Sequence, residues 1–178
     1  MKTRSLAIVL VGSFLLSLPA RADDAAQLSD VTERTLGTKT IIYREVETSL
    51  SEMGQDVGPI LEDLSKLVKE KKVVYDGCAV FVYQGLSTDP TKKFKLQVTF
   101  AVAEDTQPQG EFKVRKLEPL KCLTVLYGGP VSSIAKAYEK LFGGLGNKTP
   151  TGESREYYLN WEGVESGNNV ELIAVGVK

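Results

Sequence analysis

The sequence contains no histidine among its 178 residues, only two cysteines and a single tryptophan. Without histidine, neither a Ser-His-Asp nor a Cys-His nucleophile system can form, and a histidine-ligated zinc or haem site is excluded as well. Two cysteines cannot supply the four ligands of a structural zinc site. We therefore expect no metal and no cofactor, so that any chemistry depends on carboxylates, tyrosines, lysines or simple binding.

An excess of one charge is also missing. The chain has 22 basic and 23 acidic residues, a formal net charge of −1, and no block of either sign. A protein that tracks a polyanion needs such a basic block, so we expect no nucleic-acid partner. The hydrophobic share of 42% and the charged share of 25% are typical of a soluble globular protein and exclude a disordered or collagen-like chain.

No hydrophobic run is long enough to cross a bilayer. The apolar run Leu6–Leu18 has 13 residues, whereas a membrane-spanning helix needs about 20. It follows Lys2 and Arg4 and precedes the small-residue box that ends at Ala22, which is the layout of a secretory signal peptide. We predict a signal peptide over residues 1–22 and an exported protein, periplasmic or secreted, with no membrane contact after cleavage. The alternative is an uncleaved anchor.

Export affects the interpretation of the two cysteines. An oxidising compartment permits a disulfide between Cys78 and Cys122, and the alternative is a pair of buried thiols that behave as small apolar side chains. A redox role is not indicated, because the sequence has no Cys-x-x-Cys pair.

Apolar periodicity predicts a first structural unit. Residues 23–37 show little periodicity and are expected to form a loose leader. Residues Thr40–Glu47 predict a strand, and a helix of about 18 residues with an N-cap at Ser51 follows. Two strands, Cys78–Tyr83 and Lys93–Ala103, complete the unit.

A second unit repeats this pattern after a turn at residues 107–110. The expected elements are an extra strand, a strand, a helix and two strands, at Glu111–Leu117, Lys121–Tyr127, Val131–Phe142, Arg155–Leu159 and Val170–Val177. Two strand–helix–strand–strand units predict an α+β fold, with two amphipathic helices on an antiparallel sheet. We expect one domain over residues 38–178, with a central ligand cleft between two pseudo-symmetric halves.

Several segments of the second unit resemble a known family. They are GEFKVRKL at 110–117, CLTVLYGG at 122–129, REYYLN at 155–160 and VELIAV at 170–175. Together they resemble the GyrI-like small-molecule-binding domain, also called the bacterial transcription activator effector-binding domain, which is related to the SOUL fold. The resemblance implies a cleft that takes amphipathic, often cationic, organic molecules. The helix-turn-helix module of the family's regulators does not precede the domain here, so we expect a standalone, exported form.

The resemblance also implies that a glutamate in the penultimate strand faces the ligand. The matching residue is Glu156, and Tyr158 follows two residues later on the same face of the strand. A carboxylate beside aromatic rings suits a cation. Further candidate wall residues are Tyr43, Tyr83, Phe100, Tyr127 and Trp161. In the alternative interpretation Glu156 lies on the surface beside Arg155 or a lysine, and the aromatic side chains are ordinary strand or core residues.

Three functions remain open. The first is an exported protein that sequesters or senses a small amphipathic molecule. The second is a hydrolase of electrophilic small molecules, with Glu156 as general acid or base and Tyr158 as hydrogen-bond donor. The third is an interaction or inhibitor module that binds a protein through its sheet surface, although the sequence names no protein partner.

Overall fold

The computed structural model describes residues 26–87 and 89–178. The predicted signal peptide lies outside the described residues. Within them, no helix is both long and apolar enough to cross a membrane.

All the strands and helices expected from the periodicity are present, with slightly different bounds. The strands are β1 (Gln27–Leu28), β2 (Thr32–Leu36), β3 (Lys39–Thr48), β4 (Tyr75–Gln84), β5 (Phe94–Val102), β6 (Lys113–Leu117), β7 (Leu120–Gly128), β8 (Pro150–Asn160) and β9 (Val170–Val177). The helices are α1 (Met53–Lys69), the short 3₁₀ helix η1 (Val131–Ser133) and α2 (Ala135–Gly143). The cap prediction at Ser51 is wrong: Glu52 occupies the N-cap position and makes no side-chain capping bond.

Two strands occupy the segment that was expected to be a loose leader. Strands β1 and β2 both pair antiparallel with β7, so the leader prediction is wrong from Gln27 onward. Four of the five side chains of β2 are exposed. A strand held at the sheet edge by backbone bonds, with little burial, carries no hydrophobic alternation for sequence analysis to detect.

The sheet is antiparallel and runs in the order β1-β7-β9-β8-β4-β5-β3-β6, with β2 also on β7. Strand β6 begins the second unit but pairs with β3 of the first. Strand β2 begins the first unit but pairs with β7 of the second. The two units therefore exchange their leading strands, and β2 is the counterpart of the extra strand β6.

The register shows the pseudo-two-fold symmetry directly. Phe81 of β4 pairs with Val98 of β5, and the residues 75 positions later, Glu156 of β8 and Ile173 of β9, pair in the same way. Phe81 and Glu156 also lie opposite one another where β4 pairs with β8. The symmetry axis thus passes through the Phe81–Glu156 pair, at the centre of the sheet.

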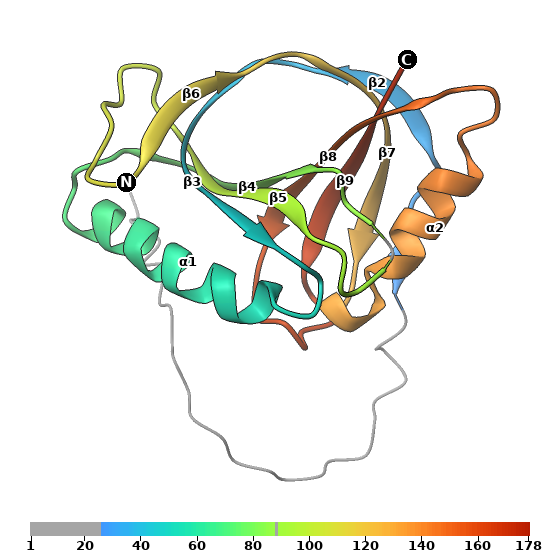
Figure 1. Cartoon of the computed structure of the whole chain (residues 1–178), viewed down its shortest axis with the longest axis horizontal. Coiled ribbons are helices and arrows are strands. Elements are labelled where there is room, and N and C mark those ends of the chain that lie inside the picture. The colour runs from blue at the N-terminus through green and yellow to red at the C-terminus, as the bar shows by residue number, and fades with distance from the viewer. Residues whose placement is uncertain (1–25, 88) are drawn as a thin grey trace, which may run out of the picture.

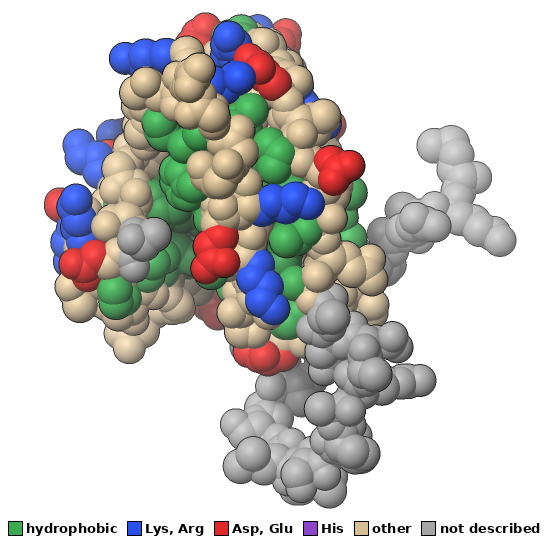
Figure 2. All heavy atoms as spheres, turned by 90° about the vertical axis from the view of Figure 1, so that its right-hand side faces the viewer, with side chains coloured by type: hydrophobic (Ala, Val, Ile, Leu, Met, Phe, Trp, Pro, Cys, Tyr) green, Lys and Arg blue, Asp and Glu red, His purple; other side chains and the backbone are tan. Residues whose placement is uncertain are grey.

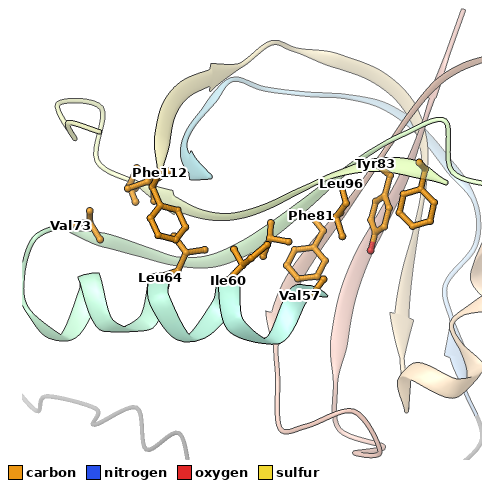
Figure 3. Packing of buried hydrophobic residues seen from close by; sticks show 12 residues of the cluster. Val57, Ile60, Leu64, Val73, Phe81, Tyr83, Leu96 and Phe112 are labelled. Carbon is orange, nitrogen blue, oxygen red and sulfur yellow. The ribbon is translucent and has the colours of Figure 1, made fainter. Parts of the chain in front are cut away.

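Both α-helices lie on the same face of the sheet, one over each half (Figure 1). Under α1, Val57 lies beside Phe81 and Leu64 beside Phe112, and Ile60 belongs to the same buried cluster (Figure 3). A second buried cluster joins α2 to strands β7 and β9. Each fully buried aliphatic or aromatic side chain contributes roughly 1.5–3 kcal/mol to stability. Glu156, at the centre of β8, lies between these two cores.

The opposite face of the sheet is also buried, and it carries both cysteines. Cys78 on β4 and Cys122 on β7 are free thiols, so the predicted disulfide is absent from the structure. Strands β8 and β9 separate β4 from β7. Three strand spacings amount to about 14 Å along the sheet, whereas a disulfide needs α carbons within about 7 Å. The interpretation as two partly or fully buried thiols fits the fold.

Candidate functional site

Glu156 lies in the middle of β8, on the face that carries the helices, and is only 3% exposed. Three tyrosine hydroxyls donate hydrogen bonds to its carboxylate. Tyr83 and Tyr158 reach Oε2 at 2.5 and 2.8 Å, and Tyr138 reaches Oε1 at 2.7 Å. The surface alternative is therefore wrong: Arg155 points to the other face of the strand, where it pairs with Glu153 instead.

The three hydroxyl donors to Glu156 come from three different elements. Tyr83 belongs to β4, Tyr158 to β8 and Tyr138 to α2. Burial raises the pKa of Glu156, although the three hydroxyl donors act in the opposite direction. Burial also raises the pKa of each tyrosine well above 10, and the neighbouring carboxylate adds to this effect. The hydroxyls therefore remain protonated donors over the physiological pH range.

A second buried carboxylate, Glu171 of β9, stands beside the first. It pairs with Tyr158 of β8 on one side and Tyr127 of β7 on the other, and its exposure is 0%. Neither of its carboxylate oxygens has a hydrogen-bond partner among the described residues. Burial, with a smaller contribution from the charge of Glu156, raises the pKa of Glu171 to about 8.

Sequence analysis did not identify Glu171 or Tyr138 as site residues. The signal for Glu171 is present, because it shares the alternation of Ile173, Val175 and Val177, whose side chains are buried on the helix face. An acidic residue that alternates with these buried side chains is expected to be buried as well. Tyr138 gives no such signal, since a tyrosine on the apolar face of a helix is usually a core residue.

Aromatic rings surround the two carboxylates on one side. The ring centroids of Phe81 and Tyr158 are 4.8 Å apart, and Trp161 stands edge-on to Tyr158 at 5.4 Å. The indole of Trp161 is 47% exposed, so the cluster reaches solvent there. Of the predicted wall residues, Tyr83 and Trp161 are thus part of the cluster.

The other three predicted wall residues have different positions. Tyr127 is buried behind Glu171, and its hydroxyl donates to the Pro130 carbonyl. Phe100 packs against Tyr75 with the two rings tilted, and Ala79 separates it from Tyr158. Tyr43 packs on the opposite face of the sheet, so its assignment as a wall residue is wrong. Strand alternation places Ile42, not Tyr43, on the helix face.

The predicted central cleft is not open at Glu156 in this structure, because three tyrosine hydroxyls surround its carboxylate. A cavity of about 360 Å³ lies between α1 and residues 109–112, and another of about 270 Å³ lies beside β1; Glu156 lines neither. From the α2 side, Figure 2 shows hydrophobic side chains between polar and charged ones on the surface. The tyrosine hydroxyls occupy the space around Glu156. In the described residues, no group of histidine, cysteine and acidic side chains is arranged to hold a metal ion.

Several solved structures share this fold at low sequence identity. The C-terminal domain of EcmrR is 15% identical with a TM-score of 0.68, over 84% of this chain and 97% of that one. The chain spans only 57% of the EcmrR chain seen in a complex with DNA. SAV2435 bound to tetraphenylphosphonium is 12% identical with a TM-score of 0.56, over 84% and 94% of the two chains. A hydrolase from Listeria innocua is 10% identical with a TM-score of 0.52, over 84% and 92%.

Sequence comparison gives the family. No curated protein sequence matches the chain. The sequence profile of the GyrI-like small molecule binding domain, however, matches residues 29–178. This range includes β2, the edge strand that the predicted boundary at residue 38 leaves out. The match covers most of the chain and agrees with the observed α+β architecture. The chain therefore belongs to the GyrI-like small-molecule-binding domain family.

Proposed function

We propose that this protein binds an amphipathic organic cation at Glu156, between its two halves. The observation that carries the proposal is a buried carboxylate without a cationic partner. Among the ion pairs of the described residues, none includes Glu156. Burying a carboxylate without a counter-charge is costly, and a bound cation removes that cost. The bound tetraphenylphosphonium of SAV2435, which shares the fold, supports a cation as the ligand class.

Ligand entry requires the tyrosines to move. Tyr138 and Tyr158 are only partly buried, and Trp161 lies at the exposed side of Tyr158. Rotation of these side chains between staggered conformers opens the carboxylate without a change of backbone. The ring faces then become available to the cation, and each cation–π contact contributes about 0.5–2 kcal/mol.

The single tryptophan makes this proposal testable by fluorescence. Trp161 is the only tryptophan of the chain and stands 5.4 Å from Tyr158, so titration with tetraphenylphosphonium should change its emission. Replacing Glu156 with Gln keeps the shape of the side chain and removes its charge. Loss of a charge-assisted contact of about 1–3 kcal/mol predicts an affinity roughly 10- to 100-fold lower.

Two controls separate local charge from other effects. Glu165→Gln removes an exposed acid from the β8–β9 connection and should leave the affinity unchanged. Triphenylphosphine oxide, a neutral analogue, should bind Glu156→Gln and the wild-type protein alike. If tetraphenylphosphonium binds the wild type and both variants equally well, Glu156 is not the cation site.

Hydrolysis of an electrophilic small molecule is the weaker candidate. A hydrolase is among the proteins that share the fold, and a buried glutamate is suited to act as general base. A general base must, however, accept a proton from water or substrate, and three tyrosine hydroxyls already donate to Glu156. Binding of a cation requires only that the tyrosine side chains rotate away from the carboxylate, and it does not require a positioned water. An interaction module that uses the sheet surface remains the third alternative.

Export is part of the proposal. The layout of residues 1–22 supports cleavage after Ala22 and a periplasmic or secreted location. Mass spectrometry of the protein from its native host should give Asp23 as the N-terminal residue. An intact Met1 in the soluble fraction would contradict export.

A further inference from the structure

Glu171 is unusual among the acidic residues that the structure describes. Its side chain is completely buried, and both carboxylate oxygens lack a hydrogen-bond partner. Leaving a buried polar group unsatisfied is destabilising, and more so for a charged group. In the first unit the equivalent position, 75 residues earlier, is held by the buried Leu96. The fold thus accepts an apolar residue at this position, and packing alone does not account for a glutamate.

The unsatisfied oxygens belong to the same site as Glu156. Glu156 lies opposite Ile173, two residues along β9 from Glu171 on the same face. Such diagonal neighbours are about 7–8 Å apart, within reach of one small molecule. Tyr158 is the direct cross-strand neighbour of Glu171 and also donates to Glu156. A ligand that replaces the Tyr158 hydroxyl at Glu156 therefore comes next to Glu171.

We infer that Glu171 is a second ligand-binding group, and that the ligand carries two separated cationic nitrogen groups, one for Glu156 and one for Glu171. Binding of this ligand releases a proton. The inference rests on the proposed function at Glu156. In the step at Glu171, the carboxylic O–H bond breaks, the proton passes to solvent, and the carboxylate accepts a hydrogen bond from an N–H group of the ligand. A monocation held by Glu156 leaves the oxygens of Glu171 unsatisfied.

In the part of the chain that the structure describes, no basic side chain shifts the pKa of Glu171. The titratable groups that face it from β8, β7 and α2 are Glu156, Tyr158, Tyr127 and Tyr138. With a pKa of about 8, Glu171 is mostly protonated at pH 7. A cation beside it lowers this pKa, so the proton leaves as the ligand binds. Affinity for a dication should therefore rise with pH, by at most tenfold per unit, and level off above about pH 8.

The test compares two ligands that differ by one charge. The monocation is 3-methylbenzamidine and the dication is benzene-1,3-dicarboxamidine; both keep their charges across pH 6–9. Calorimetric titration in two buffers of different ionisation enthalpy gives the number of protons released. For the wild-type protein at pH 7 we expect close to one proton per dication and close to none per monocation. The dication should bind at least tenfold more tightly.

Substitution of Glu171 should abolish both differences. Glu171→Gln removes the titrating group, and Glu171→Leu introduces the residue found at the equivalent position of the first unit, which keeps the test usable if the buried amide impairs folding. In either variant the dication should lose its advantage and its proton release, while the monocation keeps its affinity. A dication advantage that persists in both variants, or binding by the wild type without proton release, overturns the inference. If neither ligand and no tetraphenylphosphonium binds the wild type, the proposed function at Glu156 has failed instead.

Discussion

The buried carboxyl of Glu171 should make the empty protein less stable as the pH rises. Its folded-state pKa of about 8 lies above the ordinary value of 4.5, so the folded state binds the proton more tightly than the unfolded chain does. Stability from this group is then fully present below about pH 4.5 and is lost as the pH rises toward 8. Glu171→Gln does not titrate at this position and should lack that loss.

The magnitude follows from the pKa difference. One pKa unit corresponds to about 1.36 kcal/mol, so the interval from pH 5 to pH 8 allows a relative change of roughly 3–4 kcal/mol. At about 2–4 °C per kcal/mol for a domain of this size, the two melting temperatures should move apart by on the order of 10 °C. The buried amide of Glu171→Gln has its own cost, which does not depend on pH. The relevant quantity is therefore how the difference in melting temperature between wild type and Glu171→Gln changes with pH.

Thermal unfolding of both proteins between pH 5 and pH 8 measures this quantity. The Glu165→Gln variant, which changes an exposed acid, controls for net charge and should follow the wild type. In Glu156→Gln, stability should still fall as the pH rises, but the fall should occur at lower pH. The reason is that the charge of Glu156 helps to raise the pKa of Glu171. A difference between wild type and Glu171→Gln that stays constant from pH 5 to pH 8, or grows in the opposite direction, would refute the reasoning.

Two further predictions concern the sheet. A Cβ at Gly176 would lie 2.4 Å from Thr151 Oγ1. In denaturant titrations, Gly176→Ala should therefore lower the free energy of unfolding by about 1–3 kcal/mol. The control Gly37→Ala, with open space around it, should change the free energy of unfolding by less than about 0.5 kcal/mol. Cys78 and Cys122 should both react with a thiol reagent after denaturation without reductant, because both are free thiols; an intact mass two hydrogens lower would show a bridge instead.

The elements that sequence analysis predicted well are those with a buried face. Helix α1 and strand β5 place apolar residues at the spacing of their structures, so their patterns are readable without the fold. Strand β2 was missed for the opposite reason, since four of its five side chains are exposed and its stability comes from backbone pairing with β7. Strand β2 can be identified as the counterpart of β6 only from the sheet pairing, in which each of these strands pairs with a strand of the other unit.

The candidate site was predictable only in part. Glu156 and Tyr158 came from the family resemblance, and the alternation of β9 already places Glu171 on the buried face. Which face Tyr43 occupies was ambiguous, because Ile41 and Ile42 precede it and both are buried, on opposite faces. The hydrogen bond from Tyr138 depends on how α2 packs over the sheet, which no local pattern specifies.

The pseudo-symmetry makes the chemistry of the site one-sided. Around the axis, the first unit supplies Phe81 and Leu96 at the positions where the second unit supplies Glu156 and Glu171. Both units supply a tyrosine at the remaining position, Tyr83 and Tyr158, and both hydroxyls reach the same carboxylate. The cationic part of a bound molecule should therefore face β8 and β9, while its apolar part faces β4 and α1. The two halves thus differ at two equivalent positions, Phe81 against Glu156 and Leu96 against Glu171. These two differences are enough for a pseudo-symmetric fold to orient a ligand with its cationic end toward the second unit.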